Sequence, residues 1–514
     1  MPEAKTTFPD ENRMLILHPP LTKGCEPPAA LAYLSAALAA HNLPCTICDM
    51  NIEGLMHLLH SVTGAADTWS ARALKHLDDN IATLQTPNGY RNFDHYGRAV
   101  ADINRLLEIT GKSCNLQLSL ANYQDNCRSP LNSADLRQAA ADYRENIFFP
   151  YFSDRLEELL HQEQHAHIGF SLSYLSQALC TFAMIGYLRA HHPDKTIIVG
   201  GGLVTTWLSN PGWCNPFADL VDHFIAGQGE KPLLRLLGTE QKTVQVRPSY
   251  AALRDNPYLA PGFILPYATS SGCFWKKCNF CPETSENNPY HQVSPTTVTA
   301  DLQSLTMATS PVLIHLLDNA ISPSTLRALS EQPPGAPWYG FVRIDALLAD
   351  RDFCKRLRAS GCLMLKLGLE SGDQNVLNSM HKGIDLRHAA KVLENLHEVG
   401  IAGYVYLLFG TPAENRAAAE RTRNFVEDHH QAISFLNLAI FNLPLGSEDG
   451  TSLQVTDFYS GDLSIYRNFN HPLGWDRAEV RRYLHATFKR SPKIAAILRK
   501  DPPIFTSNHA AFMK

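Results

Sequence analysis

The stretch Ser271-Gly-Cys-Phe-Trp-Lys-Lys-Cys-Asn-Phe-Cys-Pro-Glu283 places three cysteines, Cys273, Cys278 and Cys281, in one short loop. The loop contains no fourth cysteine and no adjacent histidine that would complete a closed metal site. A structural zinc site needs four protein ligands, whereas an iron–sulfur cube held by three thiolates leaves one iron free to bind a small molecule. The loop therefore predicts an open iron–sulfur centre, with a zinc half-site as the alternative.

The composition is that of a globular protein. The chain has 514 residues, of which 45% are hydrophobic and 18% charged, enough for two domains with buried cores. Its 45 basic and 50 acidic residues give a net charge of −5, so we expect no nucleic-acid partner. The start, MPEAKTTFPDENR, is polar and acidic and lacks the basic segment followed by an apolar segment that is typical of a secretory signal. The sequence also contains no run of 18 apolar residues, the length needed to span a bilayer. We therefore expect a cytoplasmic protein without a transmembrane segment.

The first half of the chain predicts a doubly wound, Rossmann-like α/β domain. Apolar runs with the length of buried strands, separated by helical stretches, occur at 14–17, 44–49, 167–171, 196–199 and 223–226. Five such strands indicate a parallel sheet. A mostly helical, charged stretch at about 55–160 interrupts the pattern and is predicted to be an insertion.

Small and polar residues follow several of these strands. Because ligands of such sheets bind beyond the carboxyl ends of the strands, this edge is a candidate ligand face. Glycines there let a bulky cofactor approach the backbone, although they could also serve only tight strand-to-helix turns. The candidate residues are Thr22, Ser171, Ser173, Gly200, Gly201, Gly202, Gly227, Gly229 and Glu230.

The second half predicts a partial barrel. Apolar runs recur, with helical segments between them, at 264–269, 312–317, 339–344, 363–369, 404–409 and 435–441. Six βα units are typical of a partial, open barrel related to the eight-stranded TIM barrel. In such barrels the active site lies at the carboxyl ends of the strands. The cysteine loop follows the first of these strands and so belongs to that end. We expect domains at 1–245 and 258–449, and a small, mainly helical tail at 450–514.

Taken together, these features resemble the radical S-adenosylmethionine (SAM) enzymes that carry a cobalamin-binding domain before the catalytic barrel. The cysteine loop is similar to the loop that binds a 4Fe-4S cluster in that family, although the usual spacing is C-x3-C-x2-C and here it is C-x4-C-x2-C. Residues 13 to 240 resemble the cobalamin-binding domain. They lack the D-x-H-x-x-G signature whose histidine ligates cobalt in other cobalamin proteins, an absence that is ordinary in this branch.

The resemblance extends to motifs at the ends of the later strands. His315-Leu-Leu-Asp-Asn319, Arg343-Ile-Asp345, Gly368-Leu-Glu-Ser-Gly372 and Leu408-Phe-Gly-Thr-Pro-Ala-Glu414 stand where the family contacts SAM. It implies that Glu370 and Ser371 face the ribose and carboxylate of SAM, and that Asp318 and Asn319 face its amino end. Taken alone, Asp318 or Arg343 could instead be a helix cap or a surface ion pair. The implied SAM-binding residues are Phe280, Asp318, Asn319, Arg343, Glu370, Ser371, Leu408 and Gly410.

By resemblance, the cluster would reduce SAM to methionine and a 5′-deoxyadenosyl radical, which abstracts hydrogen from an unactivated carbon. With cobalamin bound, the expected outcome is methylation of that carbon; a cobalamin-linked cyclisation or rearrangement is the alternative. The implied partners are a small-molecule, lipid or peptide substrate and a one-electron reductant such as flavodoxin or ferredoxin. Two other readings are a non-radical iron–sulfur oxidoreductase, disfavoured because the first turn lacks G-x-G-x-x-G, and a zinc-bound sensor.

Overall fold

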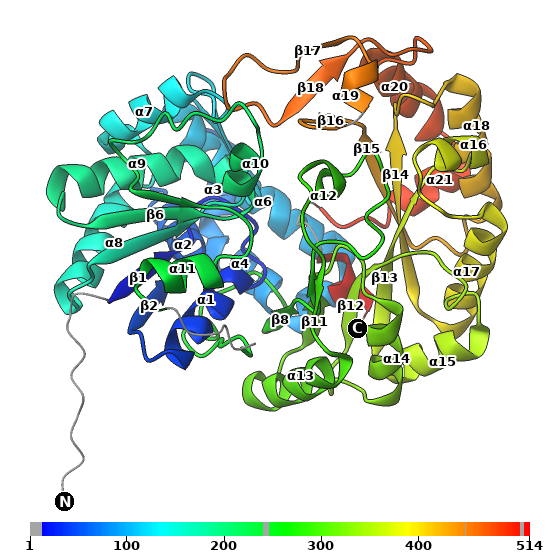
Figure 1. The fold of residues 1–514 in the computed structure, drawn as a ribbon, viewed down its shortest axis with the longest axis horizontal. Helices are drawn as coiled ribbons and strands as arrows, with labels where there is room; N and C mark the ends of the chain where they lie inside the picture. Colours follow the sequence, from blue (N-terminus) through cyan, green and yellow to red (C-terminus); the bar gives the residue numbers. More distant parts are fainter. Residues whose placement is uncertain (1–12, 240–245, 448, 504–507, 514) are drawn as a thin grey trace, which may run out of the picture. The chain divides into compact units, whose positions relative to one another are not determined.

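The computed structural model describes residues 13–239, 246–447, 449–503 and 508–513, which divide into two compact units. The first unit contains the described residues up to Pro261 together with Ser460–Ser464. The second contains Gly262–Tyr459 and most of the described residues from Ile465 onward. Figure 1 shows both as α/β structures. Residues 1–12, which carry most of the argument about secretion, lie outside the described residues.

The first unit is built on a five-stranded sheet with the order β2-β1-β5-β6-β7, in which every pair is parallel. The inner strand β1 is apolar and buried along its whole length, as the sequence predicts. The strand order changes direction between β1 and β5, which is the switch point where doubly wound folds bind ligands. The strands are β1 (Met14–Leu17), β2 (Cys45–Cys48), β5 (His167–Ser171), β6 (Thr196–Gly200) and β7 (His223–Ile225).

Helices α1 (Ala29–Ala40) and α11 (Glu230–Leu236) contact each other, and α10 (Gly202–Leu208) packs on β6 and β7. Helix α9 (Leu175–His191) is buried from Gln177 to Leu188 because α7 and α8 pack against it. These helices pack against the sheet, and the predicted cofactor-binding residues lie at the carboxyl ends of its strands.

The predicted insertion between β2 and β5 is mostly helical, and it also contains one β-hairpin. Its longest helix, α6, contacts α3, α4 and the hairpin. The elements are α2 (Met50–His60), α3 (Thr68–Lys75), α4 (Leu77–Gln85), α5 (Pro87–Arg91), α6 (Phe93–Ser113), β3 (Leu116–Ser119), β4 (Asn122–Asp125), α7 (Ser133–Ala141), η2 (Tyr143–Glu145) and α8 (Phe149–Gln162).

The second unit is built on six parallel strands with the order β15-β14-β13-β12-β11-β8, each βα unit adding one strand. This is the predicted half-open barrel, and the predicted fold class is confirmed. The strands are β8 (Ile264–Tyr267), β11 (Leu313–Leu316), β12 (Trp338–Val342), β13 (Cys362–Glu370), β14 (Ala402–Phe409) and β15 (Phe435–Ile440).

Side-chain caps fix the starts of the barrel helices. The predicted Ser294-Pro295 start is observed, because the Ser294 hydroxyl accepts a hydrogen bond from the Thr297 N–H. Asp, Asn or Ser caps open the others in the same way. The helices are α13 (Pro295–Thr309), α14 (Pro323–Glu331), α15 (Arg351–Ala359), α16 (Gln374–Ser379), α17 (Leu386–Val399) and α18 (Arg416–Asp428).

The last part of the chain, predicted as a helical tail, also contributes strands to a small antiparallel sheet with the order β16-β18-β17. No helix in the described part of the chain has both the length and the apolar character to cross a membrane. The remaining elements are β9 (Ser270–Ser271), α12 (Pro282–Ser285), β10 (His291–Gln292), β16 (Leu443–Pro444), α19 (Asp449–Ser452), β17 (Val455–Asp457), β18 (Tyr466–Phe469), α20 (Arg477–Tyr483), the π-helix η3 (Leu484–Phe488), α21 (Pro492–Leu498) and η4 (Asn508–Met513).

Candidate functional site

The three cysteines of the loop lie after the carboxyl end of β8. Cys278 is buried, Cys273 and Cys281 are half-buried, and none forms a disulfide. The three thiols are close enough to interact electrostatically with one another. Burial raises the pKa of Cys281 to about 11, because the thiolate would lose hydration there. A metal at this loop would have to supply the positive charge that stabilises the thiolates.

The donor set suits a cluster better than a single ion. Among the residues that the structure describes, no three His, Cys, Asp or Glu side chains converge on a position for one metal ion. An iron–sulfur cluster binds each thiolate at a different iron, so its ligands span a wider site. Three reduced cysteines from one loop therefore fit a 4Fe-4S cluster, and they do not form a closed zinc site.

Two cations and one carboxylate surround Cys278. The Arg343 Nη2 donates a hydrogen bond of 2.6 Å to the Lys382 carbonyl, and the Lys382 Nζ donates one of 2.7 Å to the Glu370 Oε1. Lys382 also lies over the Phe280 ring, 5.5 Å from its centroid. Burial raises the pKa of Cys278, whereas the charges of Lys382 and Arg343 oppose that shift. The structure thus brings three other predicted residues together around the Cys278 thiol: Phe280, Arg343 and Glu370.

Glu370 occupies an unusual position in the backbone. It ends β13 with a φ of 68°, and the pairing with β14 shifts register between Gly368 and Glu370. A left-handed conformation is costly for a residue with a side chain, and such residues gather at functional sites. Ser371, also predicted to face SAM, is fully buried and makes its hydrogen bonds to Thr422 and to the Asp373 N–H. The two neighbours therefore have different surroundings, and only Glu370 lies beside Cys278.

Asp318 and Asn319 follow β11. The buried Asp318 carboxylate accepts hydrogen bonds from the Thr269 N–H, the Thr269 hydroxyl and the Ser270 hydroxyl. It therefore fixes the segment between β8 and the cysteine loop. Asn319 is exposed, and its Nδ2 donates to the Glu283 Oε1 at 2.8 Å. Both residues lie close to the cysteine loop, as the motif predicts, but their described contacts are with the protein.

Leu408 and Gly410 lie at the end of β14, where Leu408 is half-buried and Gly410 has a φ of 79°. The Gly410 N–H and the Trp475 indole Nε1 both donate to the Glu414 Oε2, at 2.5 and 2.9 Å. Glu414 is fully buried, and this burial raises its pKa to about 7. The loop that carries Gly410 is thereby tied to the tail of the chain.

The sequence analysis did not identify Lys382 and Glu414 as residues of the site. Lys382 belongs to the turn Met380-His-Lys-Gly383, which resembles a family motif but gives no indication that its lysine reaches Cys278. Glu414 closes another such motif, yet its partner Trp475 is 61 residues away in the chain. Only the fold brings these partners together.

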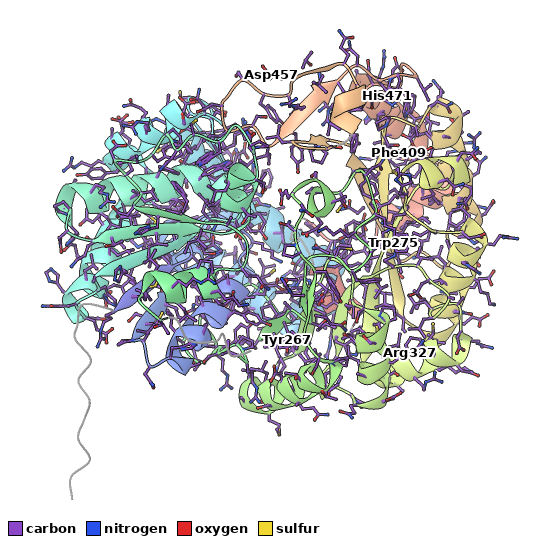
Figure 2. All side chains as sticks on the ribbon, in the orientation of Figure 1. Tyr267, Trp275, Arg327, Phe409, Asp457 and His471 are labelled. Carbon is purple, nitrogen blue, oxygen red and sulfur yellow. The ribbon has the colours of Figure 1, made fainter. Side chains whose placement is uncertain are left out.

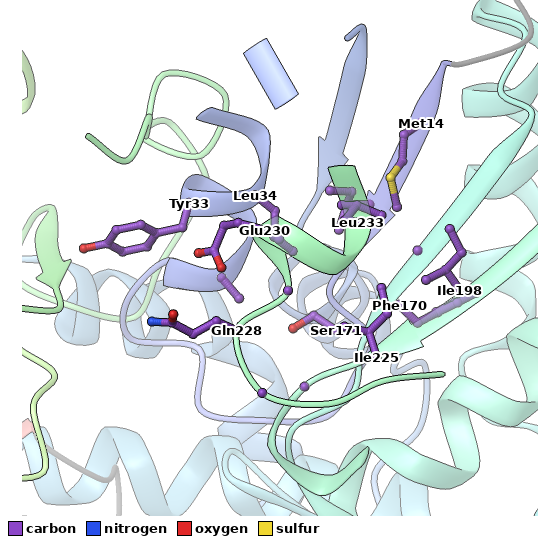
Figure 3. Close-up of a pocket in the computed structure, with 17 residues that line it drawn as sticks. Met14, Tyr33, Leu34, Phe170, Ser171, Ile198, Ile225, Gln228, Glu230 and Leu233 are labelled. Carbon is purple, nitrogen blue, oxygen red and sulfur yellow. The ribbon is translucent and has the colours of Figure 1, made fainter. Parts of the chain in front are cut away.

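The first unit contains a cavity of about 220 Å³. It is formed by the strands β1, β5, β6 and β7 and by the helices α1 and α11. Figure 3 shows Met14 and Ile198 at one end and Gln228 and Glu230 at the other. The predicted residues that line it are Ser171, Gly200, Gly201, Gly227, Gly229 and Glu230.

Three predicted residues of the same edge do not line this cavity. The Thr22 N–H donates to the Asn51 Oδ1 at 2.8 Å, the Ser173 N–H donates to Gln177, and the Gly202 N–H donates to the Ser173 hydroxyl. Their hydrogen bonds hold the loops at the strand ends.

The three glycines Gly201, Gly227 and Gly229 at the cavity differ in what a side chain would meet. Gly201 has a φ of 116°, and a Cβ there would overlap the Leu172 carbonyl oxygen. At Gly229 a Cβ would approach the Leu34 Cδ2 to 3.2 Å, whereas Gly227 faces open space. The tight-turn interpretation therefore holds for Gly201, and the approach of a cofactor to these glycines stays a prediction.

Comparison with protein families matches residues 267–426 to the radical SAM superfamily. Among curated proteins, the bacteriochlorophyllide d C-12(1)-methyltransferase of Chlorobaculum tepidum is 25% identical over 126 residues. That match spans 24% of this chain and 24% of the relative, so about a quarter of the length of either protein is aligned.

Two groups of solved structures share the fold. The radical SAM methyltransferase TsrM from Kitasatospora setae, solved with tryptophan and a SAM analogue, has a TM-score of 0.55 and 14% identity, covering 96% of this chain and 90% of its own. The cobalamin-dependent radical SAM enzyme OxsB, solved with aqua-cobalamin and SAM, has a TM-score of 0.50 and 13% identity, covering 83% and 53%. At these identities the likeness concerns the fold alone.

Proposed function

From the radical SAM domain that residues 267–426 form, we propose that this protein cleaves SAM reductively and methylates an unactivated carbon of its substrate with the help of cobalamin. The observation that carries this proposal is the loop of three free cysteines at the carboxyl end of β8, one of them beside Arg343, Lys382 and Glu370. The likeness in fold to TsrM and OxsB supports the choice of a cobalamin-linked reaction.

Cys273, Cys278 and Cys281 would hold a 4Fe-4S cluster. Bound there, the cluster supplies the electron for SAM cleavage, and cobalamin carries the methyl group. The protein's own task is to bind, orient and exclude water. Glu370 suits the SAM ribose, because one carboxylate can accept hydrogen bonds from two hydroxyls. Its bulged, left-handed backbone fixes where that carboxylate lies.

The cavity of the first unit, about 220 Å³, is too small for a whole cobalamin, so we propose that it takes an apolar part of that molecule. The cavity beside β1, β5, β6 and β7 is mostly apolar, with polar Gln228 and Glu230 at one end. Side chains at its glycines would fill it or overlap the backbone. We assign this unit to cobalamin binding and Ser171, Gly200, Gly201, Gly227, Gly229 and Glu230 to the contact surface.

The reaction also needs an external one-electron reductant, such as flavodoxin or ferredoxin, and a small-molecule, lipid or peptide substrate. A reducing compartment such as the cytoplasm would suit the cysteine loop, since none of the twelve cysteines is in a disulfide.

The proposal is tested by anaerobic purification with cobalamin supplied, followed by iron, sulfide and cobalt analysis and a SAM-cleavage assay. We expect about four irons per chain and loss of both iron and cleavage in Cys278→Ala. Cys354→Ala is the matched control, because Cys354 is also buried but lies on α15, away from the cysteine loop. Zinc in place of iron, or unchanged cleavage in Cys278→Ala, would refute the proposal.

The products distinguish the methylation from its alternative. Methyl transfer through cobalamin yields both S-adenosylhomocysteine and 5′-deoxyadenosine, because one SAM supplies the methyl group and another the radical. If 5′-deoxyadenosine is the sole SAM-derived nucleoside, the reaction is a cyclisation or rearrangement.

A further inference from the structure

The cysteine loop has four residues between Cys273 and Cys278, Phe274 to Lys277, one more than the common spacing of the family. Lys276 adopts a left-handed backbone with a φ of 45°, a conformation that is unfavourable for a residue with a side chain. The Lys276 Nζ is held by the Asn287 Oδ1 at 2.8 Å. The longer loop therefore has a defined conformation. In this conformation, Trp275 points toward the turn that carries Lys382.

Trp275, which is labelled in Figure 2, docks on the turn that carries Lys382. Its indole Nε1 donates a hydrogen bond of 3.0 Å to the His381 carbonyl. Its ring lies so close to Gly383 that a Cβ at that position would overlap it. Next to it, the Asn279 Nδ2 donates to the Ser379 carbonyl at 3.3 Å. The loop and the turn are thus joined on both sides of Cys278.

Two cations lie over the Trp275 indole ring, and one of them is Lys277, whose Nζ is 4.8 Å from the ring centroid. The Arg343 guanidinium carbon lies 3.9 Å from the ring centroid, a distance typical of a strong cation–π contact. Arg343 also donates to the Lys382 carbonyl. These two contacts hold the guanidinium against the Cys278 thiol, with which it interacts electrostatically.

Two positive charges therefore converge on one sulfur, from Arg343 and from Lys382. Glu370 offsets part of this charge through its bond to the Lys382 Nζ. The net charge around a cluster and hydrogen bonds to its sulfurs set its reduction potential. Because the reduced cluster is more negative than the oxidised one, cations beside a ligand sulfur favour reduction.

We propose that Trp275 is a positioning residue that holds Arg343 against Cys278, and that Arg343 and Lys382 together raise the reduction potential of the cluster. The inference rests on the proposed function, because it takes the three cysteines as the cluster ligands. The step concerned is the transfer of one electron from an external flavin or iron–sulfur donor, which is oxidised, to the bound cluster, which is reduced. No covalent bond forms or breaks in that step.

The test is a redox titration of the reconstituted holoprotein, followed by the electron paramagnetic resonance signal of the reduced cluster. We expect Trp275→Leu, Arg343→Gln and Lys382→Met each to shift the midpoint potential to more negative values. Arg343→Lys keeps the charge and should shift it less than Arg343→Gln. Lys355→Gln, which removes an exposed charge on α15, is the control and should leave the potential unchanged.

A second measurement separates this role from a structural one. With a strong reductant such as Ti(III) citrate, Trp275→Leu, which changes no residue assigned to SAM, should cleave SAM at close to the wild-type rate, whereas with a weaker donor its rate should fall several-fold. An unchanged midpoint in Arg343→Gln and Lys382→Met, at wild-type iron content, overturns the inference and leaves the proposed function standing. A wild-type protein that binds no reducible cluster overturns both.

Discussion

The buried carboxylate of Glu414 makes a prediction about stability and pH. Its Oε2 accepts from the Gly410 N–H and the Trp475 indole, while its Oε1 has no hydrogen-bonding partner among the described residues. With no cation to balance the charge, burial raises its pKa from 4.5 to about 7. Folding therefore favours the protonated acid, and Glu414→Gln imitates that form without the ability to ionise.

The size of the effect follows from the shift. The pKa of Glu414 differs by about 2.5 units between the unfolded and the folded protein. At about 1.36 kcal/mol per pKa unit, this corresponds to about 3 kcal/mol in the free energy of unfolding. Because the folded-state pKa is raised, this stability is fully present below the unfolded-state pKa of 4.5 and is lost as the pH rises through about 7. Glu414→Gln should therefore gain about 3 kcal/mol relative to the wild type between pH 4.5 and pH 8.

The assay is thermal unfolding of the two proteins across this pH range. For a unit of this size, about 3 kcal/mol corresponds to a relative change in Tm of roughly 6–12 °C. Asp49 and Asp501, whose pKa values burial also raises to about 7, titrate in both proteins and cancel in the difference. Glu394→Gln, an exposed change on α17, is the control. Parallel curves for the wild type and Glu414→Gln would refute the reasoning.

Three other substitutions have expected outcomes. Gly201→Ala should destabilise the first unit by about 1–3 kcal/mol and weaken cobalamin binding in an absorbance titration, because its Cβ would overlap the Leu172 carbonyl. Gly186→Ala should cost about 1–3 kcal/mol or more and speed proteolysis of the insertion, since its Cβ would overlap the Ala140 backbone. Asp318→Ala should leave three donors without their acceptor, at about 1–3 kcal/mol each, and lower the iron content of the purified protein.

Matched controls accompany these three substitutions. Gly212→Ala is the control for both glycines, because its nearest neighbour is the Asn210 Oδ1 at an ordinary contact distance of 3.6 Å. Asp318→Asn keeps an acceptor oxygen and should retain more iron than Asp318→Ala. The explanation for Gly201 would be contradicted if Gly201→Ala and Gly212→Ala bound cobalamin equally well. The explanation for Gly186 would be contradicted if Gly186→Ala and Gly212→Ala were proteolysed at the same rate. The explanation for Asp318 would be contradicted if its two variants retained the same amount of iron.

The sequence predicted the two sheets closely because most of their inner strands, such as β1, β5 and β11, are apolar and buried. Such strands are short apolar runs between turn residues, and the run at 167–171, for example, coincides with β5. The hairpin of β3 and β4 was missed, because Leu116–Ser119 and Asn122–Asp125 alternate exposed and buried residues within a polar stretch. The sheet formed by β16, β17 and β18 was missed for a related reason, since these strands are only two to four residues long.

The candidate site was predictable where it depends on motifs at strand ends, and not where it depends on contacts between loops. The sequence placed Cys278, Arg343 and Glu370 at the same end of neighbouring βα units, and the structure brings them together. It did not reveal that Ser371 faces Thr422, because a residue at a bulge loses the alternation from which its direction could be inferred. The SAM and cobalamin contacts themselves stay predictions.

The extra residue of the cysteine loop and the glycine at position 383 are physically linked. The loop can place an indole between Arg343 and the turn only if that turn has no side chain facing the ring. The same turn presents Lys382 to both Glu370 and Cys278. A change at Gly383 would thus move the indole, the guanidinium and the ammonium group together. In this longer loop, Trp275 therefore couples the cysteine loop to the turn that holds Glu370, the residue predicted to face the SAM ribose.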